Sequence, residues 1–266
     1  MKNNVHKIDV IMEEHLPSFE TLKEVKKHQS NAKKALKALG LPCKDINNCR
    51  LNRRCYNGFC PVCTRLIRKK ILSASTEISQ LKYHFVTINP KGWLIPANDN
   101  RQFDSIIDNK QIKAFIEELK KDYPENLIVI GGIEVLYKTI GNVPQGKRFH
   151  MHCIISGPTK NEIKKAASRN FKLDDRMKNP LLIKEVKATE EDFFKTISYA
   201  FKQPLLAKSF KHKDSKGVYQ TLQTTALEEL IQNYGPHSVF DRLILEGVKW
   251  DGSKFIITAK IKNDQR

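Results

Sequence analysis

Strand-like and helix-like segments alternate between residues 83 and 203, which leaves few folds open to this part of the chain. The strand-like segments are rich in β-branched and aromatic residues: 83–89, 126–138, 148–157 and 180–187. The helix-like segments carry apolar residues at helical spacing: 104–123, 159–170 and 190–203. This β-α-β-β-α-β-α order predicts an α+β fold, a ferredoxin-like core with an antiparallel sheet and one extra helix. Helices on one face of the sheet would leave the other face free for a ligand.

Two histidines lie one residue apart in the third predicted strand. Because side chains alternate along a strand, His150 and His152 share a face, while Cys153 points to the opposite, buried face. The preceding strand of the predicted hairpin has Glu134 as its only acidic residue, and Glu134 is placed to reach the histidines. Together these side chains offer oxygen and nitrogen ligands to a metal ion. Without partners, the two histidines would also fit a pair of core residues or half of a zinc site.

Tyr199 and Lys202 lie three residues apart in the last predicted helix, so they share one helical face. In a ferredoxin-like core this helix can pack on the sheet and aim Tyr199 toward the metal ligands. A tyrosine hydroxyl is a poor nucleophile at its ordinary pKa of about 10, but a divalent cation that polarises a phosphodiester lowers the barrier to its attack. Lys202 would steady the phosphate or the phenolate. Alternatively, Tyr199 belongs to the buried apolar face of the helix, and Lys202 lies at the solvent-exposed edge of that face.

Five of the six cysteines form a cluster in the first quarter of the chain. They are separated by five, five, four and two residues, and Gly58 and Pro61 suit a tight turn at the final C-x2-C pair. In a chain without a secretion signal, this spacing favours one structural zinc ion over disulfides. Four of the following five would bind it: Cys43, Cys49, Cys55, Cys60 and Cys63. The last three are the core of the set, and the fourth ligand is Cys49 or Cys43; chance clustering of free thiols is the alternative.

The charge of the chain points to a polyanionic partner. There are 47 Lys and Arg residues against 29 Asp and Glu, a formal net charge of +18, so nucleic acid is the expected ligand. Basic residues interleave with Tyr56 and Phe59 around the cysteines, which suits phosphate contact and base stacking. The candidate DNA-binding residues are Arg50, Arg53, Arg54, Arg65, Arg68 and Lys69. The alternative is a small structural zinc module whose basic side chains are merely solvated.

The chain divides into four predicted regions. They are an N-terminal helical region (1–42, helix 17–39), a cysteine-rich zinc-binding module (43–75), the core (83–204) and a C-terminal α/β extension (205–266). In the extension we expect a Lys-rich loop at 208–217, a helix at 225–234 and a strand at 254–262, which either extend the core or form an accessory unit. No apolar run approaches the ~20 residues that span a bilayer, and the N-terminus lacks a signal peptide pattern. We therefore expect a soluble, cytoplasmic protein with no membrane partner.

Taken together, the motifs resemble those of the HUH endonuclease superfamily, specifically the rolling-circle replication initiators of plasmids and phages. "HFVTIN" is similar to the first motif of the family, "FHMHCIISG" to its metal-binding histidine motif, "YAFK" to its catalytic Y-x-x-K motif, and "GGIEVLYK" to the strand that carries its acidic ligand. The resemblance covers about residues 83 to 204. The cysteine-rich segment resembles, more loosely, the zinc modules that precede the catalytic domain in some initiators and related transposases.

The resemblance implies an HUH endonuclease fold and a metal-dependent enzyme that nicks and rejoins single-stranded or hairpin DNA at a replication origin. Tyr199 would attack the scissile phosphate, giving a 5′-phosphotyrosine link and a free 3′-hydroxyl, with Lys202 as its helper. Glu134, His150 and His152 would hold Mg²⁺ or Mn²⁺. A host helicase and polymerase would be further partners.

Several features bear on which branch of the family the chain resembles. Members with two active tyrosines carry the second one turn on, where this chain has Lys202 and Gln203, so one nucleophile is expected. Some single-tyrosine initiators place a glutamate one turn before the tyrosine, where this chain has Lys195. Relaxases carry the tyrosine before the histidine motif, unlike this chain. Two alternatives stay open: a transposase with the same chemistry, and a non-catalytic zinc-containing DNA-binding regulator. Thr87 and Asn89 share a strand face and are expected to line the site.

Overall fold

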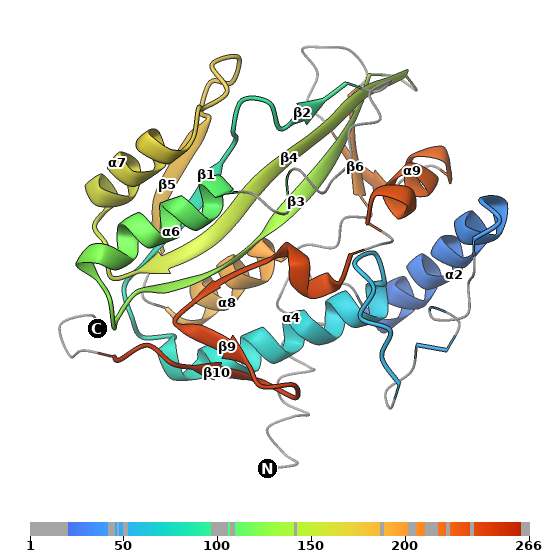
Figure 1. Cartoon of the computed structure of the whole chain (residues 1–266). Coiled ribbons are helices and arrows are strands. Elements are labelled where there is room, and N and C mark those ends of the chain that lie inside the picture. The colour runs from blue at the N-terminus through green and yellow to red at the C-terminus, as the bar shows by residue number, and fades with distance from the viewer. Residues whose placement is uncertain are drawn as a thin grey trace.

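One eight-stranded sheet organises the chain, here described from a computed structural model (Figure 1). The structure describes residues 21–41, 46, 48–49, 53–96, 106, 110–140, 143–186, 189–201, 206–210, 218–221, 224–234 and 237–261. The main path of the sheet runs through β5 (Leu181–Val186), β1 (Tyr83–Ile88), β4 (Val143–Ser156), β3 (Ile128–Ile140), β6 (Leu206–Phe210) and β7 (Val218–Thr221). Two further strands pair off this path, β2 (Leu94–Ile95) with β4 and β8 (Leu243–Glu246) with β3.

The hairpin of β3 and β4 is the longest feature of the sheet and fixes which residues face each other. Its register pairs Ile128 with Ser156 at one end and Ile140 with Val143 at the other, with an irregularity at Lys138. The other neighbours along the path are also antiparallel, except that β6 runs parallel to β3. Residues far apart in sequence are thereby held at fixed positions on the two sheet faces.

Helices cover both faces of this sheet (Figure 1). On one face α6 (Lys110–Asp122) and α7 (Lys160–Asn170) pack on a core that includes Val86, Met151 and Cys153. On the other face α4 (Pro61–Ser75) and α8 (Glu190–Ala200) pack on a second core that includes Tyr83 and Ile154. The expectation that one face stays free of helices is therefore wrong, because the apolar residues of α4 and α8 need a surface to bury against.

The coarse class, α+β, is confirmed, and the seven elements predicted between residues 83 and 203 are present as β1, α6, β3, β4, α7, β5 and α8. The predicted N-terminal helix corresponds to α2 (Leu22–Ala38), which begins at a capping box formed by Thr21 and Glu24. Two short helical turns, η1 (Thr76–Ile78) and η2 (Val239–Arg242), were not expected. None of the helices described in the structure is both long and apolar enough to cross a membrane.

The C-terminal extension adds to the core sheet instead of forming a separate unit. It supplies β6, β7 and β8, so the prediction of a loop at 208–217 is wrong for the residues that fall in β6. The predicted helix at 225–234 is α9 (Thr224–Tyr234). The predicted final strand is β10 (Phe255–Ile257), which pairs with β9 (Val248–Trp250) in a small second sheet near α4 (Figure 1).

Candidate active site and metal centres

The three predicted ligands of a divalent ion come together on the β3–β4 hairpin. Glu134 on β3 lies directly opposite His150 on β4, and His152 follows on the same face. One carboxylate oxygen, Oε2 of Glu134, lies 3.4 Å from Nε2 of His150 and 3.2 Å from Nε2 of His152. All three side chains are buried. The group therefore has the compactness that a shared metal ion requires.

The charge state of this group also suits a cation. Burial alone would raise the pKa of Glu134, but His150 and His152, when their imidazoles are protonated, outweigh it and hold the pKa of that carboxyl well below its usual range. Although two ring nitrogens face it, Oε2 of Glu134 makes no hydrogen bond within the described part of the chain. A buried, ionised oxygen that lacks a hydrogen bond and faces two imidazoles is a fitting donor set for a divalent metal.

Thr87 supports one of the two histidines from the neighbouring strand. Thr87 on β1 pairs with His152 on β4, and its Oγ1 lies 2.8 Å from Nδ1 of His152. When the hydroxyl accepts the Nδ1 proton, the imidazole keeps the tautomer whose Nε2 lone pair points toward Glu134. Asn89, predicted beside Thr87, is instead tied to the loop before β5, where its amide donates to the carbonyl of Pro180.

Thr87→Val should weaken binding of Mn²⁺ by about 10-fold, because the imidazole of His152 loses the group that sets its tautomer and orientation. Titration of the protein with Mn²⁺ measures this affinity, because bound Mn²⁺ no longer contributes to the electron paramagnetic resonance signal of the free ion. Thr76→Val is the matched control, since its hydroxyl donates to the carbonyl of Leu72, away from the group. Equal affinities for the two variants would contradict the role of Thr87.

Tyr199 lies beside Glu134, His150 and His152, the metal-ligand group, in the last turn of α8. Its ring meets that of His152 edge-on, with centroids 5.2 Å apart. Phe85 on β1 stacks on His152 at 5.5 Å and meets Tyr199 edge-on at 5.8 Å, so three aromatic rings fix one another. Burial, and then the negative charge of Glu134, raise the pKa of Tyr199, so its hydroxyl keeps its proton at neutral pH. Lys202 lies outside the described residues.

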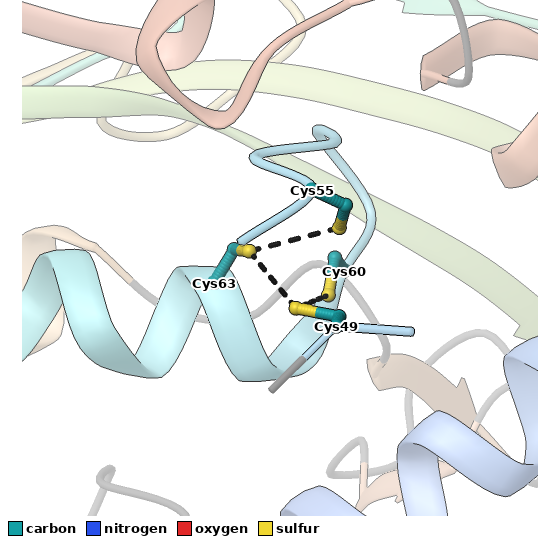
Figure 2. Close-up of side chains that lie close together, drawn as sticks. All are labelled: Cys49, Cys55, Cys60 and Cys63. Atoms are coloured by element: carbon teal, nitrogen blue, oxygen red, sulfur yellow. Dashed lines mark hydrogen bonds between the residues drawn. The ribbon is translucent and has the colours of Figure 1, made fainter. Parts of the chain in front are cut away.

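Four cysteines form the second candidate metal centre, at the start of α4 (Figure 2). The Sγ atoms of Cys49 and Cys63 lie 3.4 Å apart, and the Cys55–Cys63 and Cys60–Cys49 pairs are both at 3.7 Å. None of these thiols is in a disulfide. Four sulfur atoms turned toward one point are the arrangement of a tetrahedral structural site. Of the two alternatives for the fourth ligand, Cys49 belongs to the cluster, while Cys43 lies outside the described residues.

The backbone around the cysteines supports this cluster. The amide of Tyr56 donates to Sγ of Cys63 over 3.2 Å. Tyr56 also adopts the left-handed backbone conformation, with φ of 50°, which is uncommon for a residue other than glycine. Cys60 occupies the N-cap of α4 and Pro61 its first turn, so the helix starts from the cluster itself.

The candidate DNA-binding residues differ in their exposure. Arg53 is exposed, and Arg54, Arg65 and Lys69 are half-buried, whereas Arg50 lies outside the described residues. Arg68 departs from the prediction, because only 1% of its surface is exposed and its guanidinium binds Ser198 on α8. Phe59 is also buried and so does not offer its ring to a base.

Two features of the site were missed by sequence reasoning. Phe85 shares the face of Thr87, two positions away, so strand alternation alone could have found it. Gly132 lies opposite His152, and a Cβ there would come within 3.1 Å of the carbonyl oxygen of Arg242 and 3.4 Å of that of Ala200. The absent side chain lets the end of α8 approach β3, a use of glycine that the Gly131–Gly132 pair inside a strand could have signalled.

The site thus draws on three elements: β3 and β4 supply Glu134, His150 and His152, and α8 supplies Tyr199. Each of these four residues was predicted, and the structure places them in one cluster. In comparisons with known proteins, no family model, no curated protein and no solved structure matches the chain.

Proposed function

We propose that the chain is a replication initiator of the HUH type, which nicks and rejoins single-stranded origin DNA by tyrosine attack. The observation that carries this proposal is the meeting of a buried Glu-His-His group with the ring of Tyr199. A ferredoxin-like core is supported by the strand order β5-β1-β4-β3 with α6 and α7 on one face. Start of rolling-circle replication on a plasmid or phage is the biological role that we infer from this chemistry.

In the proposed reaction, Oη of Tyr199 attacks the scissile phosphorus. The bond from phosphorus to the 3′ oxygen breaks, and the products are a 5′-phosphotyrosine and a free 3′-hydroxyl. Tyr199 releases its proton and the leaving 3′ oxygen takes one up; Lys202 is proposed to steady the charge on the phosphate or phenolate. Glu134, His150 and His152 would hold Mg²⁺ or Mn²⁺, which supplies positive charge to the scissile phosphate. Rejoining is the same reaction in reverse.

The other parts of the chain are assigned roles around this reaction. We assign a structural Zn²⁺ to Cys49, Cys55, Cys60 and Cys63, because a site made of four cysteine thiolates is typical of structural zinc. Arg53, Arg54, Arg65 and Lys69 are proposed to hold the phosphates of the DNA on the side of this module. The net charge of +18 would draw the DNA in.

A covalent adduct assay tests this proposal. Wild-type protein, incubated with Mn²⁺ and a panel of single-stranded DNA hairpins, should give a protein–DNA adduct that survives denaturing electrophoresis. His152→Ala should lower the rate of adduct formation by at least about 100-fold, because the metal site loses a ligand. His84→Ala is the matched control and should keep the rate, since His84 points to the other side of β1 from Thr87.

Two results of this assay would count against the proposal. Absence of any wild-type adduct across the panel, with Mg²⁺ as well as Mn²⁺, would favour the non-catalytic DNA-binding regulator. An adduct that His152→Ala forms as fast as the wild type would remove the assigned metal site from the reaction.

A further inference from the structure

Arg68 is the largest of the fully buried side chains in the described structure. Its Nη2 atom donates to the backbone oxygen of Ser198 over 3.1 Å and to Oγ of Ser198 over 2.8 Å. Ser198 is itself buried, with 2% of its surface exposed. Burial of a guanidinium is costly unless it is well bonded, so this contact between segments 130 residues apart needs a reason beyond filling space.

At one end, the contact holds the turn of α8 that carries Tyr199. Ser198 directly precedes Tyr199, and α8 ends at Ala200. The last carbonyls of a helix lack partners within the helix, and among the described residues the Ser198 carbonyl also accepts a long bond, 3.4 Å, from the amide of Phe201. A cation at this end of a helix is also favourable for the helix dipole. Arg68 therefore acts as a cap that α4 supplies to α8.

At its other end, the contact leads to the cysteine cluster. Arg68 lies five residues after Cys63 on α4, and Cys60 is the N-cap of that helix. Between them Ile67 packs in the same apolar cluster as Ile197 of α8, so the two helices meet through side chains as well as through the guanidinium. One continuous, packed path thus runs from the four sulfur atoms along α4 to the turn that presents the tyrosine.

We propose that Arg68 is a positioning residue that couples the four-cysteine metal site to Tyr199. The cysteine site fixes the start of α4, α4 fixes Arg68, and Arg68 holds the last turn of α8 so that Oη of Tyr199 stays aligned with the metal-ligand group. In this role Arg68 touches neither the DNA nor the metal ion. The inference rests on the proposed function, in which Tyr199 is the nucleophile.

The kinetic test uses the full chain with Mn²⁺ and a DNA hairpin that the wild type attacks. Arg68→Met should lower kcat for adduct formation by about 100-fold, and Ser198→Ala by about 10-fold, with KM for DNA and affinity for Mn²⁺ little changed. The double variant should be no slower than Arg68→Met alone, because both changes break one contact. Added guanidinium should restore part of the kcat of Arg68→Ala.

Arg242→Met is the matched control. Arg242 lines the same pocket as Arg68 and is also buried, with 5% of its surface exposed. It donates to Thr64 on α4 over 3.4 Å. Its loss removes a buried charge from the same pocket and leaves the bonds between Arg68 and Ser198 in place, so kcat should fall by less than about 3-fold. An equal fall in kcat for Arg242→Met and Arg68→Met would overturn the coupling. So would an Arg68→Met variant with normal kcat and raised KM, the result expected of a phosphate contact.

Hydrogen exchange at residues 199–201 reports on the same contact without any need for activity. In Arg68→Met, in Ser198→Ala and in protein stripped of the metal at the cysteines, these amides should exchange at least about 10-fold faster, while the amides of α6 should not change. If Arg68→Met does not fold, Ser198→Ala decides the matter. Faster exchange together with no wild-type adduct would retain the coupling and reject the proposed function; normal exchange and kcat in Ser198→Ala and Arg68→Met would reject the coupling alone.

Discussion

Tyr199→Phe is expected to lower the rate of covalent adduct formation by at least about 10³-fold, since the variant keeps the ring and loses the oxygen that attacks in the proposed reaction. The ring contacts with His152 and Phe85 should persist, so the affinity for Mn²⁺ should stay at the wild-type value. Single-turnover assays with labelled hairpin DNA measure the rate. The matched control is Tyr123→Phe, whose hydroxyl donates to Glu162 across the α6–α7 face of the sheet.

A Tyr199→Phe variant that forms the adduct at more than a few per cent of the wild-type rate would identify a different nucleophile. A comparable loss of rate in Tyr123→Phe would show that removal of any tyrosine hydroxyl disturbs the fold. Loss confined to Tyr199→Phe, with metal affinity intact, would separate the nucleophile from the metal ligands.

Cys60→Ser should remove the metal from the cysteine centre and lower the melting temperature by about 10 °C or more. Cys60 is fully buried, its Sγ lies 3.7 Å from that of Cys49, and it forms the N-cap of α4, so the start of that helix depends on it. Free energy of binding at a structural zinc site contributes directly to folding. Metal analysis of the purified protein should find about one zinc ion per chain in the wild type and none in the variant.

Two further variants control for this result. His150→Ala should keep the zinc, since the Glu-His-His group is a separate centre. Cys153→Ala should also keep the zinc but lose stability. Cys153 is buried in the core between the sheet and the helices α6 and α7, away from the cysteine cluster. Zinc lost equally from Cys60→Ser and His150→Ala would contradict the presence of two separate centres.

The candidate metal ligands were predictable from the sequence because strand geometry determines their placement locally. The period of two puts His150 and His152 on one face, and the hairpin register that brings Glu134 opposite His150 follows from the short connection between the strands. The same period assigned Cys153 to the buried face, where the structure has it. The cysteine spacing likewise placed Cys55, Cys60 and Cys63 in one cluster.

Features that depend on packing between distant segments were not predictable in this way. Arg68 stands among other basic residues of the cysteine-rich segment, and nothing near it in the sequence shows that Ser198, 130 residues on, will bury it. Packing of α8 on the sheet was expected, but the cover of the same face by α4 was missed, because helical periodicity shows that a helix face is apolar but not what it packs on. Residues 208–210 of β6 were predicted to be loop, because the pairing of β6 with β3 is non-local.

The central claim is that Tyr199, beside a metal held by Glu134, His150 and His152, is the residue that attacks DNA. Tandem mass spectrometry of the peptides from the wild-type adduct, formed with Mn²⁺ and a hairpin DNA and digested with nuclease and protease, tests it most directly. We predict a nucleotide joined through its 5′-phosphate to Tyr199. A nucleotide on any other residue, or DNA cleavage without a modified peptide, would contradict the claim.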